Sequence, residues 1–145
     1  MIVGVGVDTV DVPGFARQLA DPASVFAERV FTALEHDVVA GRPARDKAAH
    51  FAARYAAKEA FIKAWSASRS GAPAALATVD LADIEVRSDA RGRPSIALHG
   101  AVAVAFAAAG ARCAIHLSMS HDGDVAVAFV VIDDVAPRDG LATKE

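Results

Sequence analysis

Residues 54–65 read RYAAKEAFIKAW, and the fold of the chain depends on the helix that this stretch predicts. From Lys47 to Trp65 the sequence has no Gly or Pro and is rich in Ala, Lys, Arg and Glu, which are strong helix formers. A helix advances by about 100° per residue, so large side chains at helical spacing share one face. We expect the core-facing stripe to consist of Phe51, Tyr55, Ile62 and Trp65.

Ionic side chains are crowded beside this apolar stripe. Lys58 lies near its middle, and Glu59 lies on its shoulder, one turn before Lys63. A lysine that extends to solvent and an ion pair on the helix surface would be the ordinary explanation. A site that holds a metal and a polyphosphate against an apolar wall needs the same arrangement, and the number of charges favours this second interpretation.

The composition limits the class of protein. With 145 residues the chain fits one domain, which we expect to span residues 1–134, followed by a flexible tail at 135–145. Hydrophobic residues make up 54% and aromatic residues only 6%, so we expect an Ala/Val-rich core that other subunits help to complete. The net charge of -3 argues against nucleic-acid binding. The apolar runs are too short to cross a membrane, and we expect no secretory signal. The single Cys113 suits a reducing cytoplasm.

The first ten residues alternate between two faces, as a strand does. We expect one face to join the core through Val3, Val5 and Val7. The other face carries two glycines that lead to Asp8, which would leave open space beside this carboxylate for a ligand. A bulge followed by a strand-ending Asp explains the same residues about equally well.

The remaining elements alternate between short helices and strands. Helices are predicted from Pro13, over 26–39 with a Thr32–Glu35 capping box, and over 101–109 up to Gly110. Strands are predicted at 84–87, 95–99, 113–120 and 125–132. The expected fold class is therefore α+β, with antiparallel strands packed on one long helix and shorter helices.

Two of these strand regions present polar side chains. A turn between the strands at 84–87 and 95–99 presents Arg91 and Arg93. In the strand at 113–120, His116, Ser118 and Ser120 share one face, which is either solvent-exposed or a ligand wall.

Asp8 and Glu59 are the candidate metal ligands. Two carboxylates, completed by water and substrate phosphate oxygens, are how proteins usually hold Mg²⁺. The metal would bridge a diphosphate, and Lys63 could protonate or hold the departing phosphate. Further phosphates could be held by Arg54, Lys58 and Arg93. Two acids far apart in the sequence are a weak signal by themselves.

Together these motifs resemble the holo-acyl-carrier-protein synthase family, the small trimeric type of phosphopantetheinyl transferase. The resemblance runs along nearly the whole chain, through GVGVD at 4–8, FTALE at 31–35, RYAAKEAFIK at 54–63, GRP at 92–94 and IHLSMSH at 115–121. The strand aspartate followed by Lys-Glu-Ala-x-x-Lys is the specific part of this pattern. The family implies a phosphopantetheinyl transferase-like fold and a homotrimer with its sites between subunits.

The resemblance also implies a reaction and its site residues. Phosphopantetheine would move from coenzyme A to a serine of an apo acyl carrier protein, with release of adenosine 3′,5′-bisphosphate. Asp8 and Glu59 would bind Mg²⁺, and Lys63 would lie against the diphosphate as a proton source or charge clamp. Candidate contacts with coenzyme A are Arg54, Lys58, Arg93, His116 and Ser118.

The base that removes the serine proton is left open by the residues. Glu59, a metal-bound water, or His121 with Asp122 could serve. His116 and His121 could equally satisfy only local hydrogen bonds. We expect Glu35 to cap its helix rather than to touch the metal directly.

One position departs from the family pattern. Many members carry an Arg six residues after the strand Asp, where it meets the acidic carrier, whereas this chain has Gly14 there. We therefore expect carrier docking to involve other basic residues: Arg17, Arg42, Arg45 and Lys47.

Two other functions stay open at this stage. One is a Mg²⁺-dependent hydrolase of nucleotide diphosphates, although the chain lacks a cluster of acids on one helix. The other is a coenzyme A-binding module without catalysis, although both candidate metal ligands and Lys63 are present.

Overall fold

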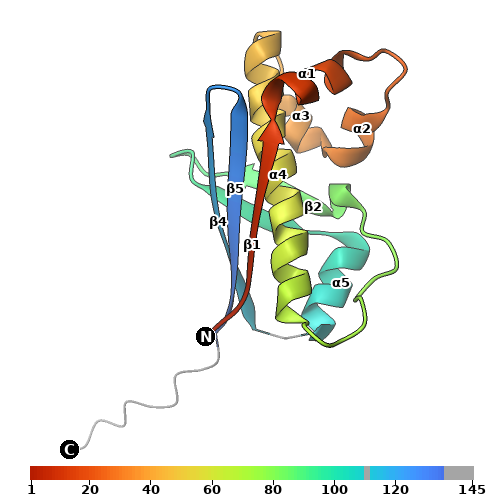
Figure 1. The fold of residues 1–145 in the computed structure, drawn as a ribbon, viewed down its shortest axis with the longest axis vertical. Coiled ribbons are helices and arrows are strands. Elements are labelled where there is room, and N and C mark those ends of the chain that lie inside the picture. Colours follow the sequence, from red (N-terminus) through yellow and green to blue (C-terminus); the bar gives the residue numbers. More distant parts are fainter. Residues whose placement is uncertain (110–111, 136–145) are drawn as a thin grey trace, which may run out of the picture.

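The computed structural model describes residues 1–109 and 112–135 (Figure 1). The expected domain boundary after residue 134 stays a prediction, because the tail from residue 136 lies outside the described residues. Gly110, the expected end of the helix over 101–109, also lies outside them. The elements follow in the order β1 (Ile2–Asp11), α1 (Val12–Ala20), α2 (Phe26–Val30), α3 (Ala33–Val39), α4 (Ala44–Ser68), η1 (Leu81–Asp83), β2 (Ile84–Ser88), β3 (Pro94–Leu98), α5 (Gly100–Ala109), β4 (Cys113–Asp122) and β5 (Val125–Asp134). None of these helices is long and apolar enough to cross a membrane.

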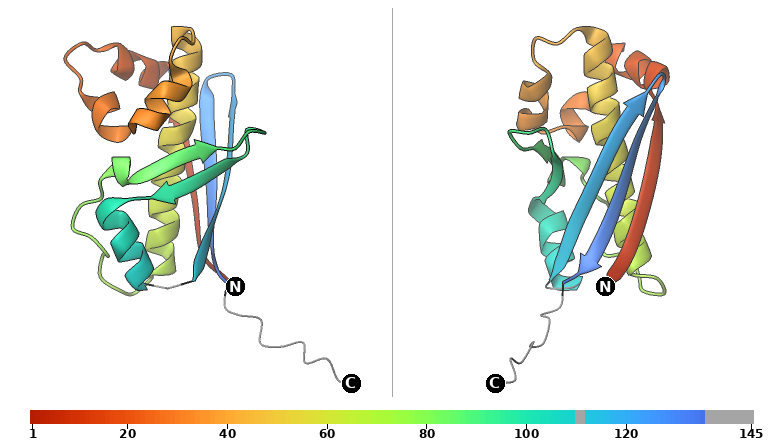
Figure 2. Two further views of the ribbon diagram at one scale, coloured as in Figure 1. Left: turned by 180° about the vertical axis from the view of Figure 1, so that it is seen from behind. Right: turned by 90° about the vertical axis from the view of Figure 1, so that its left-hand side faces the viewer.

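Helix α4 lies between two antiparallel layers. A three-stranded sheet in the order β1-β5-β4 covers one side, and the β2–β3 hairpin with α5 covers the other (Figure 2). The short helices α1, α2 and α3 gather around the N-terminal end of α4 (Figure 1). The expected α+β class, with antiparallel strands packed on a long helix, is thus confirmed.

Because α4 is enclosed in this way, it is buried on more than the one stripe that the sequence predicts. Phe51 and Trp65 are buried as expected, but the small residues of the helix are buried too. Ala56, Ala57 and Ala60 have no exposed surface, and their size lets the sheet approach the helix closely.

The prediction for the two faces of β1 is wrong. Val5 and Val7 are 46% and 51% exposed, whereas Gly4 and Gly6 are buried against α4. A Cβ atom at Gly6 would overlap the carbonyl oxygen of Ala60. The glycines therefore do not leave space for a ligand, because the backbone of α4 fills that space.

The helix predicted over 26–39 is divided into α2 and α3, and the capping box predicted inside it marks the start of α3. The Glu35 amide donates to Thr32 Oγ1 at 3.3 Å, and the Thr32 amide donates to Glu35 Oε2 at 2.9 Å.

A cluster of aromatic rings packs α1 and α2 against α4. It consists of Phe15, Phe26, Phe31, Phe51 and Tyr55.

Candidate active site

Asp8 and Glu59 line one cavity, although 50 positions separate them in the sequence. The cavity has a volume of about 440 Å³ and lies between the end of β1, the start of α1 and the middle of α4. The two carboxylates reach it because β1 runs directly along α4, over Gly4 and Gly6. The two carboxylates therefore border the same cavity, which a shared metal would require.

Lys63 joins the same group from the next turn of α4. Its Nζ donates to Asp8 Oδ1 at 2.7 Å and to the carbonyl oxygen of Val7 at 3.1 Å. The lysine side chain is about half exposed, at 53%, so its ammonium group can also meet a ligand from solvent. The carboxylate partner of Lys63 is thus Asp8, across the helix–strand contact, rather than Glu59 on its own helix.

Tyr55 is the residue of this site that sequence reasoning missed. It was expected only in the core, but its side chain also lines the cavity of Asp8 and Glu59. Burial raises the pKa of its phenol, and the charge of Glu59, a hydrogen bond with Glu59 and the charge of Asp8 act in the same direction. The four-residue spacing between Tyr55 and Glu59 was the available signal, because such residues are neighbours on a helix.

The donor set fits a hard divalent cation that keeps several waters. No cluster of three or more His, Cys, Asp or Glu is found within residues 1–109 and 112–135. Mg²⁺ commonly uses one or two protein carboxylates together with substrate phosphates, so Asp8 and Glu59 suffice for it. When bound, Mg²⁺ would supply Lewis-acid stabilisation of a charged phosphoryl group.

Lys58, expected to contact coenzyme A, lies in the interior of the protein. Its side chain has no exposed surface, and Nζ donates to the carbonyl oxygens of Val30 and Leu81 at 2.8 and 3.0 Å and to Glu35 Oε2 at 2.8 Å. The three donors of the ammonium group are thus used within the fold. The structure therefore argues against a contact between Lys58 and coenzyme A.

Arg54 lies near this interior but is not closed off from the surface. It is 8% exposed, and its Nη1 donates to the carbonyl oxygen of His50 at 3.3 Å. Burial lowers the pKa of Arg54 to about 10, although the nearby charge of Glu35 acts in the opposite direction. A guanidinium group remains a cation at neutral pH under these conditions, so Arg54 can still attract a phosphate.

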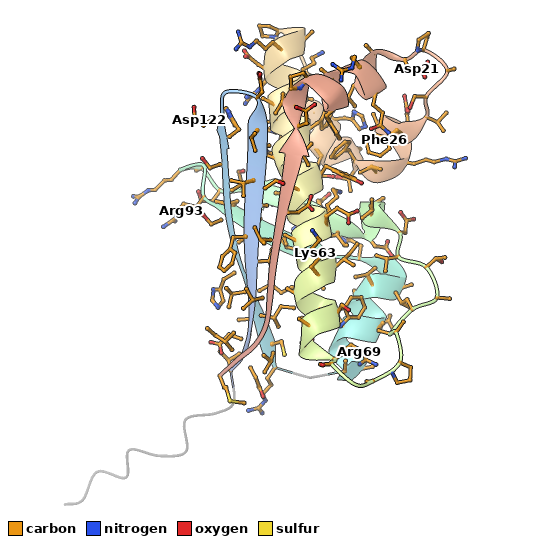
Figure 3. The ribbon with its side chains drawn as sticks, in the orientation of Figure 1. Asp21, Phe26, Lys63, Arg69, Arg93 and Asp122 are labelled. Carbon is orange, nitrogen blue, oxygen red and sulfur yellow. The ribbon has the colours of Figure 1, made fainter. Side chains whose placement is uncertain are left out.

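The remaining candidates lie on the β2–β3 hairpin and on β4 rather than beside β1. Arg93 is at the tip of the β2–β3 hairpin, where its Nε donates to Asp89 Oδ2 at 2.6 Å. His116 and Ser118 point outward from β4, and His121 and Asp122 stand at its end. Figure 3 shows Lys63 on the β1 side of the sheet, and Arg93 and Asp122 on the β4 side. One chain does not bring the two groups together.

The basic residues expected at the docking surface lie partly around another cavity. This cavity, of about 970 Å³, is lined by α1, by the start of α4 with Arg45 and Lys47, and by the β4–β5 turn with His121. At position 14 a Cβ atom would stand 2.6 Å from Asp11 Oδ2, which accepts the Gly14 amide in the N-cap of α1. An Arg at position 14 would therefore disturb this cap.

Comparisons with known proteins show the family of this chain. The family model of the 4′-phosphopantetheinyl transferase superfamily matches residues 4–130, and the chain belongs to this family. The resemblance predicted from the sequence motifs is thereby confirmed, and the chain is an enzyme of the phosphopantetheinyl transferase class.

Individual relatives place the chain more closely within the family. The holo-[acyl-carrier-protein] synthase of Mycobacterium tuberculosis is 46% identical over 136 residues, which cover 91% of this chain and 97% of the relative. The acyl carrier protein synthase–coenzyme A complex of Chronobacterium ammoniagenes has a TM-score of 0.84 at 44% identity, covering 90% of this chain and 96% of that one. The Mycobacterium tuberculosis acyl carrier protein synthase structure has a TM-score of 0.70 at 39% identity, covering 92% and 99%.

Proposed function

We propose that this enzyme transfers phosphopantetheine from coenzyme A to a serine of an apo acyl carrier protein. The observation that carries the proposal is the shared cavity of Asp8 and Glu59 with Lys63 bonded to Asp8. The similarity to holo-[acyl-carrier-protein] synthases, one of them described as a complex with coenzyme A, supplies the substrates. Mg²⁺ would be held by Asp8 and Glu59.

In this reaction the serine oxygen attacks the β-phosphorus of coenzyme A. A new P–O bond forms to the serine, and the bond to the oxygen bridging the two phosphates breaks. Adenosine 3′,5′-bisphosphate leaves with the negative charge, which Lys63 can balance or protonate from its position one turn after Glu59. The phosphoryl group and the pantetheine arm stay together throughout.

The serine proton needs an acceptor close to the attacked phosphorus. Glu59 lies in the cavity itself, whereas His121 and Asp122 lie at the β4 end of the sheet. Glu59 is therefore the base that a single chain supports best, and His121 with Asp122 could act only from a neighbouring subunit. A neutral Glu59→Gln variant should lose transfer whether the base is Glu59 or His121 with Asp122, because Glu59 is also the proposed metal ligand.

We further propose that the enzyme is a homotrimer with each site between two subunits. The outer face of the sheet exposes Val5, Val7 and Phe129, with Phe129 44% exposed. Such a patch suits a subunit interface. A ring of copies would place β4 of one chain, with His116 and Ser118, and the tip of its β2–β3 hairpin, with Arg93, beside β1 and α4 of the next, with Asp8 and Glu59. Sedimentation of wild type and Phe129→Asp tests this, and a wild-type monomer would contradict it.

The direct test of function is the mass of the carrier. Wild-type enzyme with Mg²⁺, coenzyme A and an apo acyl carrier protein should add one phosphopantetheine to the carrier. Release of free phosphopantetheine without carrier modification would instead support the hydrolase, and binding of coenzyme A without any product would support the module. We expect the enzyme to work in the cytoplasm, where coenzyme A and carrier are both present.

A further inference from the structure

Tyr55, Glu59 and Lys63 follow one another at intervals of four residues along α4. Residues four apart on a helix are neighbours on one face, so these side chains form a row beside β1. Lys63 bonds Asp8 on that strand, and Tyr55 and Glu59 line the cavity that Asp8 also borders. Glu59 therefore lies between two hydrogen-bond donors of different kinds, the ammonium group of Lys63 and the phenol of Tyr55.

Each of the two candidate metal ligands has a donor beside it. Asp8 accepts the ammonium group of Lys63 at 2.7 Å. Glu59 has Tyr55, whose phenol is placed to donate a hydrogen bond to the Glu59 carboxylate. A carboxylate has two oxygens and about four acceptor positions, so a bond from the phenol to one oxygen leaves the other oxygen for a cation. Glu59 can therefore be held by Tyr55 and bind a metal at the same time.

The ring of Tyr55 is fixed by two other helices. Its centroid lies 5.6 Å from that of Phe15 on α1 and 5.5 Å from that of Phe26 on α2. Phe15 and Phe26 also pack edge-on against each other at 5.7 Å, so each of the three rings contacts the other two. Rings that are packed in this way have little freedom to change rotamer. The phenol oxygen of Tyr55 therefore has a defined position at the cavity.

Packing alone does not account for a tyrosine at position 55. A phenylalanine would fill the same place among the rings without bringing a hydroxyl group to the cavity. Burying a hydroxyl group costs free energy unless the group has a hydrogen-bond partner. Glu59 is placed to be that partner, and the cavity lining puts the hydroxyl group next to the proposed metal.

We propose that Tyr55 is a positioning residue, which holds the Glu59 carboxylate in the orientation that binds Mg²⁺. The inference rests on the proposed function and deepens its metal site. Side chains that hydrogen-bond a metal ligand typically contribute about 10–100-fold to metal affinity or activity, because they orient the ligand. Tyr55 acts through Glu59 and does not itself contact the metal or the phosphates.

The variant Tyr55→Phe removes the hydroxyl group and keeps the ring. Its Kd for Mn²⁺, measured by electron paramagnetic resonance, should be about tenfold higher than that of wild type. Its melting temperature should stay close to the wild-type value, because the three rings still pack together. At low Mg²⁺ its rate of transfer should fall by a similar factor and should recover as Mg²⁺ is raised. A wild-type Kd for Mn²⁺ in Tyr55→Phe would overturn the proposal.

Phe106→Leu is the control for a general loss of packing. Phe106 belongs to a separate group of rings, with Phe61 and Trp65 at 5.6 and 5.9 Å. This variant should lower the melting temperature and leave the Kd for Mn²⁺ unchanged. If Phe106→Leu weakens Mn²⁺ binding as much as Tyr55→Phe does, the effect of Tyr55 is only structural and the proposal fails.

A double variant tests whether Tyr55 acts through Glu59. Glu59→Asp keeps a carboxylate but withdraws it from the phenol by the length of one methylene group. In this background Tyr55→Phe should cause no further loss of Mn²⁺ affinity, because the bond that it removes is already lost. A second tenfold loss would show that Tyr55 acts independently of Glu59, contrary to the proposal.

The wild-type enzyme separates this inference from the function on which it rests. If wild type binds no Mn²⁺, or adds no phosphopantetheine to a carrier, the proposed function itself fails. If wild type does both and Tyr55→Phe binds Mn²⁺ equally well, only the role of Tyr55 is wrong.

Discussion

Lys58 and Glu35 form an ion pair of 2.8 Å in which neither side chain has any exposed surface. Burial lowers the pKa of Lys58, and the charge of Glu35 acts against this shift. The pair joins α4 to α3, and the same carboxylate accepts the amide of Val86 at 3.0 Å and so reaches β2 as well. The residue before the proposed metal ligand Glu59 thus serves to hold three elements together.

The first prediction concerns this pair. Lys58→Met should lower the free energy of unfolding by about 3–5 kcal/mol, because it leaves Glu35 buried without its cation. The double variant Lys58→Met, Glu35→Leu should regain part of this loss. Urea unfolding of the two single variants and the double variant measures the coupling. Additive losses would show that the pair does not act as a unit.

The second prediction concerns the close contact between β1 and α4. Gly6→Ala should cost about 2–3 kcal/mol, because a methyl group would overlap the backbone of Ala60 and force the strand away. The control is Ser95→Ala, since this side chain is exposed on β3 and lies outside that contact. Thermal unfolding compares the two. If Gly6→Ala is as stable as Ser95→Ala, the strand and helix are not tightly packed in solution.

This contact also explains what the sequence could and could not predict. The alternation of residues 2–8 correctly predicts a strand, and the assignment of its faces failed because small residues usually suggest open space. Here α4 presents Ala60 and Ala64 to β1, and only the pairing of two small surfaces reveals that glycine is required. The tertiary fold decides that β1 packs on this face of α4, and the sequence of either element alone does not show this pairing.

The candidate site was more predictable in its types of residue than in their positions. Asp8, Glu59 and Lys63 meet because the motif residues lie on rigid elements. Lys58 belongs to the same charged motif as Glu59 and Lys63, so the sequence does not mark it as buried. Its three hydrogen-bond acceptors come from elements that are distant in the sequence. Tyr55 was missed because an aromatic residue on an apolar stripe usually belongs to the core alone.

The third prediction concerns the site itself. Asp8→Asn should reduce transfer by at least about 10²–10³-fold, since it removes charge from the proposed metal ligand and from the Lys63 pair. Lys63→Met should lower kcat by a similar factor with little change in metal affinity. Titration with Mn²⁺, followed by electron paramagnetic resonance, separates the two effects. Normal Mn²⁺ affinity in Asp8→Asn would contradict its role as a ligand.

The fourth prediction concerns pH. The pKa of His50 is lowered to about 4, first by burial and then by the charges of Arg54, Arg42 and His121. Its value in the unfolded chain is 6.5, so the unfolded state binds a proton first and stability is lost as pH falls from about 6.5 to 4. Since His50 is only half-buried, we expect a contribution of about 1–2 kcal/mol.

The test of this pH effect is the variant His50→Gln. Its free energy of unfolding should change less than that of wild type between pH 6.5 and 4.5, and the two curves should run parallel above pH 7. Urea titrations at several pH values give both curves. Parallel curves through the whole range would show that His50 does not take up its proton on unfolding.

The fifth prediction concerns the docking of the acidic carrier. Arg45 and Lys47 line the cavity beside α1, and position 14 cannot take an Arg without disturbing the Asp11 cap. The double charge reversal Arg45→Glu, Lys47→Glu should raise the KM for the carrier about tenfold or more at low salt, with kcat and the KM for coenzyme A little changed. The difference from wild type should shrink as salt is added, because screening weakens the attraction. The double variant Arg29→Glu, Arg112→Glu carries the same change in net charge at two exposed positions outside this cavity and serves as the control. A double variant with the wild-type KM for the carrier at low salt would place docking on another surface.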